Sequence, residues 1–255
     1  MSGISVVIIT LNEERNIVRC IQSLQGLADE VLVVDSHSAD RTCELAIQLG
    51  ARVISQDWQG YAATKNFANS QAKYDHILSL DADEALSDKL RRSIIQIKET
   101  WPADGFAMNR LTNYCGHWIR HCGWYPDRKL RLFNKKKGCW TGEIIHETVT
   151  MEEGTTLLHL KGDLLHFSYY SMADHIKQAE KFTDLTAKEA FLKDKNAGRV
   201  KILFAPKLKF FRDYFFRMGF LDGFYGYTVC RISSYATFLK YNKLWQYNFN
   251  KQKGG

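Results

Sequence analysis

The sequence lacks the long uncharged runs of membrane-spanning proteins and the N-terminal pattern of secreted ones. Its longest uncharged runs fall well short of the roughly 18 to 20 residues that a membrane-spanning helix needs. The chain does not open on a basic segment followed by an apolar stretch and a small-residue cleavage site, so we expect no secretory signal. Its six cysteines form no dense framework, which favours a reduced, cytosolic setting.

Two common nucleotide-binding motifs are also missing. No Gly-x-Gly-x-x-Gly follows the first apolar run, and there is no Walker-type loop, which disfavours dinucleotide-binding and P-loop proteins. Metal-binding residue types are dense at Cys115, His117, His121 and Cys122, but their spacing is not that of a usual zinc site.

What the sequence does contain is a regular alternation of strand and helix patterns. Apolar runs at residues 4–10, 30–35, 52–55 and 76–81 each lead through a polar turn into a helical pattern. Such alternation predicts an α/β fold with a mostly parallel central sheet and helices on both faces. A chain of 255 residues with 45% hydrophobic content can fill the core of one large domain with an appendage.

The run at 76–81 ends at two carboxylates, Asp81 and Asp83, with one residue between them. Open α/β sheets bind ligands beyond the carboxyl ends of their strands. A turn there can aim both acids at Mg²⁺ or Mn²⁺, which completes its coordination with substrate phosphates. The alternative is the start of a helix, with Asp83 as the N-cap and Glu84 as a first-turn acid.

Four motifs in order extend this interpretation: residues 5–12, 33–42, 60–66 and 80–84. Together they resemble family 2 glycosyltransferases of the GT-A fold, over roughly the first 150 residues. The resemblance implies a UDP-sugar donor and a divalent metal, although Ser36 stands where a second acid often follows Asp35. The implied site residues are Asp35 at the uracil, Thr10, Asn12 and Glu13 along the base and ribose pocket, Lys65 near the nucleotide, and Asp81 and Asp83 at the ribose and metal.

Residues 101–150 are rich in aromatic and basic side chains, which suit sugar rings and anionic groups. We place the acceptor there, with Trp124, Arg128 and Arg131 as binding residues, although tryptophans equally suit a core. For the catalytic base there are two acids, Glu143 and Glu147, about 13 Å apart on a strand at roughly 3.3 Å per residue. We favour Glu147, and the alternative is that it only pairs with a basic residue such as Arg131.

The whole chain most closely resembles small bacterial enzymes that add a β-1,4-linked glucose to a heptose of the lipopolysaccharide inner core. Residues 129–133, the pair His146 and Glu147, and residues 165–169 are typical features of that group, and His166 is a candidate third metal ligand. The resemblance implies inverting transfer from UDP-glucose to a lipid-linked core oligosaccharide. Two other classes stay open: a non-catalytic sugar-nucleotide or polysaccharide-binding protein, and a magnesium-dependent nucleotidyltransferase.

The C-terminal residues 199–255 differ in composition from the rest. They hold eleven Lys and Arg against two Asp, a net charge of +9, and sixteen aromatic residues. We therefore expect a GT-A domain over 1–198, with a nucleotide-sugar half at about 1–100 and an acceptor half at about 101–198. Residues 207–217 read as an amphipathic helix on the cytoplasmic face of the inner membrane. A helical annex packed on the sheet and a nucleic-acid surface are the alternatives, and we expect no nucleic acid.

Overall fold

A computed structural model describes residues 3–142 and 147–253, which divide into two compact units. The sheet unit comprises Met1–Leu111 and Asp127–Phe167, and the helical unit comprises Thr112–Pro126 and Ser168–Gly255. The division after Phe167 differs from the boundary expected at residue 198. It does so because the helix Met172–Leu192 packs against the C-terminal helix and belongs with it.

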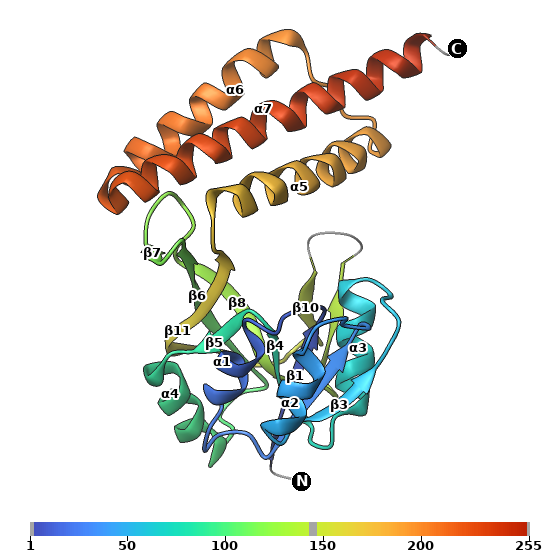
Figure 1. The fold of residues 1–255 in the computed structure, drawn as a ribbon, viewed down its shortest axis with the longest axis vertical. Coiled ribbons are helices and arrows are strands. Elements are labelled where there is room, and N and C mark those ends of the chain that lie inside the picture. Colours follow the sequence, from blue (N-terminus) through green and yellow to red (C-terminus); the bar gives the residue numbers. More distant parts are fainter. Residues whose placement is uncertain (1–2, 143–146, 254–255) are drawn as a thin grey trace. The chain divides into compact units, whose positions relative to one another are not determined.

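The sheet unit is built on four parallel strands, β1 (Ile4–Thr10), β2 (Glu30–Asp35), β3 (Arg52–Ser55) and β4 (His76–Asp81), in the order β3-β2-β1-β4 (Figure 1). These are the four predicted apolar runs. The helices α1 (Ile17–Gln22), α2 (Thr42–Gln48) and α3 (Tyr61–Gln71) connect them, which confirms the predicted alternation.

The sheet continues beyond β4 with antiparallel pairs, so as a whole it is mixed. In the full order β3-β2-β1-β4-β8-β6-β11-β5, β8 is antiparallel to β4 and β6, and β5 is antiparallel to β11. A separate two-stranded sheet pairs β10 with β9. The further elements are α4 (Asp88–Lys98), β5 (Glu84–Leu86), β6 (Gly105–Tyr114), β8 (Asp127–Asn134), β9 (Gly138–Thr141), β10 (Thr148–Met151) and β11 (Leu157–Tyr169).

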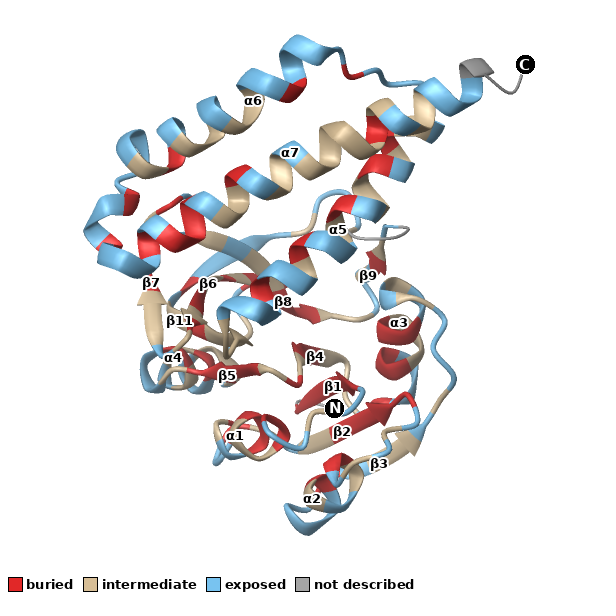
Figure 2. Cartoon of the chain, turned by 45° about the horizontal axis from the view of Figure 1, so that its top comes forward, coloured by how far each residue is buried: buried red, intermediate tan, exposed pale blue. Residues whose placement is uncertain are grey.

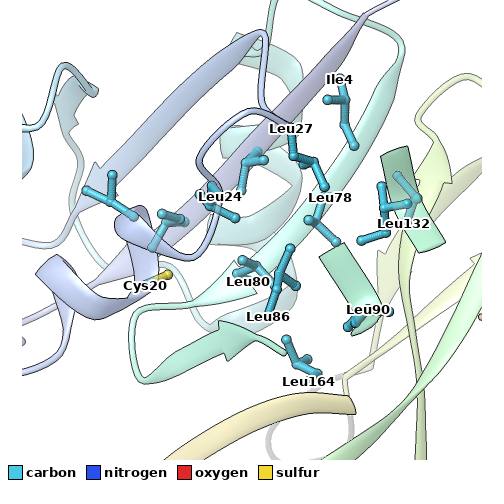
Figure 3. Packing of buried hydrophobic residues seen from close by; sticks show 14 of the residues in the cluster. Ile4, Cys20, Leu24, Leu27, Leu78, Leu80, Leu86, Leu90, Leu132 and Leu164 are labelled. Carbon is cyan, nitrogen blue, oxygen red and sulfur yellow. The ribbon is translucent and has the colours of Figure 1, made fainter. Parts of the chain in front are cut away.

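The core lies on both faces of the parallel strands, because successive side chains of a strand point to opposite faces. In β1, Val6 and Ile8 belong to the larger core cluster and Val7 and Ile9 to the smaller one. Leu24 after α1 and Leu90 of α4 fill the larger cluster together with strand residues (Figure 3). Every residue of β1 is buried, as expected of a strand covered on both sides (Figure 2).

The segment after Asp81 is a tight turn followed by strand β5, not a helix. Glu84 pairs with His166 in the antiparallel β5–β11 ladder. Helix α4 begins later, with Ser87 as the N-cap that accepts a hydrogen bond from the Leu90 backbone N–H at 3.3 Å. The alternative that Asp83 and Glu84 start a helix is therefore wrong.

The helical unit contains α5 (Met172–Leu192), α6 (Arg199–Phe211) and α7 (Gly223–Lys253), and α7 packs against both other helices (Figure 1). Strand β7 (His117–Ile119) pairs with the end of β6. Ser171 caps α5 in a reciprocal capping box with Asp174. Of the residues Cys115, His117, His121 and Cys122, whose spacing argued against a zinc site, His121 pairs with an acid: its Nδ1 lies 2.9 Å from Asp222 Oδ1. No group of three or more His, Cys, Asp or Glu side chains in residues 3–142 and 147–253 is arranged to hold a metal ion.

Residues 207–217 are not one regular helix. Helix α6 ends at Phe211 and continues as the π-helical turn Arg212–Phe216, after which Met218 adopts a left-handed conformation with φ of 52°. The 3-10 turn Gly219–Asp222 then leads into α7. Within the described part of the chain, no helix combines the length and the apolarity needed to cross a bilayer.

Candidate functional site

The polar residues predicted at three strand ends do meet at one edge of the sheet. In the β1–β2 ladder Thr10 is paired with Asp35, and in the β1–β4 ladder Ile9 is paired with Asp81. Neighbouring strands lie about 4.8 Å apart, so these side chains share a short stretch of the carboxyl edge. This is the position at which open α/β sheets bind their ligands.

The loop after β1 is fixed to the loop after β2. Asn12, with a left-handed φ of 54°, donates its N–H to Ser38 Oγ at 2.7 Å and accepts the Ala39 N–H on its Oδ1 at 2.8 Å. The Glu13 N–H is donated to Thr42 Oγ1 at 2.8 Å. The edge of the sheet is thus closed by two mutually bound loops, which gives a rigid base for a ligand.

Thr10 and Asp35 are both buried at this edge. The Asp35 carboxylate accepts hydrogen bonds from the N–H and the hydroxyl of Ser38, so it also shapes the turn after β2. The Thr10 hydroxyl has no hydrogen-bond partner among the described residues. The Thr10 hydroxyl could therefore form a hydrogen bond to a ligand at this edge, whereas the Asp35 carboxylate already accepts hydrogen bonds from the loop after β2. Its contact with uracil stays a prediction.

Asp81 lies between two cationic side chains. Its Oδ1 is 2.9 Å from Lys65 Nζ and its Oδ2 accepts a hydrogen bond from Arg131 Nη2 at 2.8 Å. Burial by itself disfavours the charged form of Asp81, but the charges and hydrogen bonds of Lys65 and Arg131 outweigh it. They hold the pKa of Asp81 well below its ordinary value. Asp81 is therefore ionised, and the positive charges of Lys65 and Arg131 balance its negative charge.

Arg131 also holds Glu84, the first residue of β5. Its Nη2 donates to Glu84 Oε1 at 2.8 Å, while Glu84 Oε2 accepts the Asp81 N–H at 3.0 Å. Arg110 Nη1 lies 3.7 Å from the same Glu84 carboxylate. These bonds tie the strand before the Asp81–Asp83 turn to the strand after it, so the turn has a fixed geometry.

The ring of Trp140 lies under both cations. Lys65 Nζ is 4.3 Å from the centre of the ring and the Arg131 guanidinium carbon is 5.4 Å from it. The amide side chain of Asn66 holds the Trp140 backbone at both its N–H and its carbonyl, at 2.9 and 2.8 Å. Because an aromatic face attracts cations, Trp140 helps to keep Lys65 and Arg131 beside Asp81.

Glu147, the favoured base, reaches this cluster through Lys65. Its Oε1 lies 3.3 Å from Lys65 Nζ, and its side chain is 21% exposed. Glu147 does pair with a basic residue, as the alternative to the base assignment held, but this residue is Lys65 and not Arg131. Glu143 and His146 lie outside the described residues.

Asp83 and His166 form the second part of the site. His166 Nε2 lies 3.2 Å from Asp83 Oδ2, and both side chains are partly exposed. Burial disfavours the Asp83 carboxylate, but the charge and hydrogen bond of His166 lower its pKa below the ordinary value. Burial also raises the pKa of Glu13, and the negative charges of Asp83, Asp40 and Asp81 add to that rise. Glu13, Asp81 and Asp83 thus lie close enough to act on one another electrostatically.

Of the three residues predicted to bind an acceptor, only Arg128 is exposed. Arg131 is 3% exposed and its guanidinium lies between Asp81 and Glu84, which favours a positioning role over contact with an acceptor. Trp124 belongs to the helical unit, where it packs edge-on against Tyr114 and His175. Its contact with an acceptor stays a prediction.

Sequence reasoning missed the roles of Glu84, Arg110 and Trp140. Glu84 was considered only in the alternative, as a first-turn helix acid, and the signal against this was the apolar pair Ala85 and Leu86, which suits a short strand. Arg110 and Trp140 carried no local signal, because their partners are distant in the sequence.

Known proteins that are similar to this chain include several glycosyltransferases. The model of glycosyl transferase family 2 matches residues 5–150. An uncharacterized glycosyltransferase of Rickettsia typhi is 32% identical over 96% of this chain and 87% of its own length. The lipopolysaccharide core biosynthesis glycosyltransferase LpsC of Rhizobium meliloti is 30% identical over 95% of this chain and 92% of its own.

Among solved structures, glucosyl-3-phosphoglycerate synthase of Mycobacterium tuberculosis, crystallised with Mn²⁺, UDP and glucosyl-3-phosphoglycerate, is 27% identical over 44% of each chain, with a TM-score of 0.37. That match covers less than half of either chain, so the assignment rests on the two sequence comparisons. The family model covers more than half of the chain, and the relatives span nearly all of it. The chain belongs to glycosyl transferase family 2.

Proposed function

We propose that this glycosyltransferase transfers glucose from UDP-glucose to a heptose of the lipopolysaccharide inner core, with inversion at the anomeric carbon. The observation that carries the proposal is Lys65, whose ammonium group contacts both Asp81 at the strand end and Glu147. One buried cation thus joins the expected donor edge to the expected base. LpsC, similar over nearly the whole chain, supports the choice of a lipopolysaccharide core acceptor.

The reaction we propose is a single displacement. The acceptor hydroxyl gives its proton to the Glu147 carboxylate while its oxygen forms a bond to the anomeric carbon of glucose. The bond from that carbon to the UDP phosphate oxygen breaks, and UDP leaves with the electron pair. Because the new bond forms opposite the one that breaks, the configuration inverts. Thr10, whose buried hydroxyl has no partner among the described residues, would bind the nucleotide together with Asn12, Glu13 and Asp35.

The donor set at Asp83 and His166 fits a divalent cation. The Asp83 carboxylate, in the turn after β4, and the His166 imidazole, in β11, leave most coordination positions for diphosphate oxygens and water, as Mg²⁺ and Mn²⁺ require. Asp81 fits less well as a direct ligand, because Lys65 and Arg131 already occupy its two oxygens. We propose Asp83 and His166 as the protein ligands. When bound, the cation would offset the negative charge of the departing UDP.

The proposed acceptor is lipid-linked, so the protein would work on the cytoplasmic face of the inner membrane. The +9 net charge of residues 199–255 supports a peripheral location at anionic lipid. Arg128, exposed at the start of β8, is the candidate for binding an anionic group of the acceptor.

The test uses UDP release from UDP-glucose with Mn²⁺, with and without a defined core acceptor. Glu147→Gln keeps the shape and still accepts a hydrogen bond from Lys65, so UDP-glucose binding should hardly change. Turnover should fall by about 10² to 10⁴, as is typical when a general base is lost. Glu153→Gln, on the exposed turn after β10, is the matched control and should leave turnover unchanged.

Three outcomes would contradict the proposal. If Glu143→Gln lowers turnover in this way and Glu147→Gln does not, the base is Glu143. If Glu147→Gln lowers stability but not turnover, Glu147 is only the partner of Lys65. Release of pyrophosphate from a nucleoside triphosphate would instead identify a nucleotidyltransferase.

A further inference from the structure

Helix α6 carries a row of large apolar side chains that face solvent. Val200, Phe204, Leu208, Phe211 and Phe215 are 72, 55, 68, 56 and 51% exposed. Their spacing of four, four, three and four residues places them on one face of the helix and its π-helical continuation. We call this row the apolar stripe, and it lies on the largely exposed helix α6 (Figure 2).

The opposite side of α6 already has its partner. Ile202 is buried there, and Ser234 of α7 donates its hydroxyl to the Pro206 carbonyl at 2.7 Å. Arg231 of α7 lies over the ring of Phe210 at 5.6 Å. Because α6 packs on α7 through this side, the apolar stripe is not needed for the core of the helical unit.

The turn after α6 exposes a second apolar group, which we call the apolar tip. Between the two helices and at the start of α7, five large side chains are 47 to 81% exposed: Phe216, Met218, Phe220, Leu221 and Phe224. A monomeric soluble protein rarely exposes so many large apolar side chains together, so the stripe and the tip indicate an interaction surface.

The backbone beneath the tip is held by two buried acids. Asp213 accepts a hydrogen bond from Arg212 at 3.0 Å and pairs with Lys209 and Arg217. Asp222 accepts the backbone N–H groups of Arg120 and His121. Their partners hold both carboxylates inside the helical unit, so the tip is presented on a rigid base.

The charges around the stripe and tip have one sign. Asp213 and Asp222 are the only acids in residues 199–255, and both are buried. Arg199, Lys201 and Lys207 are exposed on α6 itself. Within the described residues 199–253, the surface therefore combines apolar side chains with positive charge, and both carboxylates are buried.

The apolar side chains and the positive charge together indicate which kind of partner this surface binds. A second copy of the chain would bring the same positive charges against these, so the two copies would repel each other. The basic side chains could bind the phosphates of a nucleic acid, but aliphatic side chains such as Val200, Leu208 and Leu221 make no favourable contact with a phosphate backbone. An anionic lipid bilayer satisfies both features, because basic groups bind its headgroups and apolar groups enter the boundary below them.

We propose that the stripe and the tip dock this protein on an anionic lipid bilayer, with α6 lying along the headgroup boundary and the tip inserted into it. The inference deepens the peripheral location in the proposed function and rests on it. It also predicts how binding responds to salt. Attraction between surface charges is screened within about 10 Å at 0.1 M, whereas the contribution of inserted apolar side chains is retained at high salt.

The experiment is flotation of the full chain with vesicles of equal parts phosphatidylglycerol and phosphatidylcholine, without UDP-sugar or acceptor. We expect binding at low salt and weaker but residual binding at high salt. Phe216→Ser with Phe224→Ser should lower affinity at least tenfold and abolish the residual binding. Lys201→Ala with Lys207→Ala should lower low-salt affinity about 25-fold, at about fivefold for each basic residue near an anionic surface.

The matched control is Ile47→Ser with Leu49→Ser, which removes two exposed apolar side chains from the end of α2 in the sheet unit and should not alter binding. All exchanged residues are exposed, and thermal unfolding verifies that each variant folds. Turnover with a soluble acceptor should stay unchanged in the tip variant, so loss of docking and loss of transfer are distinguished. Wild-type binding in the tip variant, equal binding to pure phosphatidylcholine, or a dimer in solution that the tip variant dissociates would each overturn the proposal.

Discussion

Arg131 offers a test of whether the active site depends on an internal ion cluster. In Arg131→Met, the side chain keeps much of its volume but loses both hydrogen bonds, to Asp81 and to Glu84. Breaking a buried ion pair by removing one partner costs about 3 to 5 kcal/mol, because an uncompensated charge stays behind. Lys65 remains on Asp81, and Arg110 remains 3.7 Å from Glu84. We therefore expect the lower end, about 3 kcal/mol.

The assay is urea unfolding followed by circular dichroism, together with acceptor KM and turnover. Arg131→Met should lose stability and turnover together, because the Asp81–Asp83 turn loses its attachment to β5. Adding Glu84→Gln should recover about 1 to 2 kcal/mol, since the amide is uncharged and can still accept the Asp81 N–H. Arg128→Met is the matched control on the same strand, and being exposed it should unfold like the wild type.

The result that would refute this reasoning is specific. If Arg131→Met unfolds within about 0.5 kcal/mol of the wild type, as a surface substitution does, the cluster does not hold the turn. A raised acceptor KM with unchanged stability would restore Arg131 to the acceptor-binding role.

Two further predictions concern metal dependence and pH. Asp83→Ala should abolish transfer while costing about 1 kcal/mol or less, because its pair with His166 is partly exposed; near-normal activity with Mn²⁺ would sink the metal assignment. Burial lowers the pKa of His175 from 6.5 to about 4. The unfolded chain therefore binds this proton first as pH falls below 6.5, and stability should drop by about 2 kcal/mol by pH 5. His175→Gln should remove that part of the pH dependence. If the wild-type free energy of unfolding in urea is the same at pH 7 and pH 5, the prediction for His175 is wrong.

The sequence by itself determined the parallel half of the sheet. The runs at β1 and β2 are apolar and rich in β-branched residues, which suits strands covered on both faces. The runs at β3 and β4 are less regular, and the alternation of strand and helix patterns along the chain identified them as strands. The bounds of these strands and the meeting of Thr10, Asp35 and Asp81 at one edge followed from that alternation. The ordered motifs, taken together, were specific enough for the family.

The partners of the site side chains were decided only by the tertiary structure. Lys65 meets Glu147 across 82 positions and Arg131 meets Asp81 across 50, and no local pattern encodes such pairs. The same holds for Glu84, which suits a helix start in isolation but becomes a strand residue because β11 supplies the ladder. Local propensities act over a few residues, whereas the charge state and the position of a buried carboxylate depend on whichever distant side chains the fold brings to it.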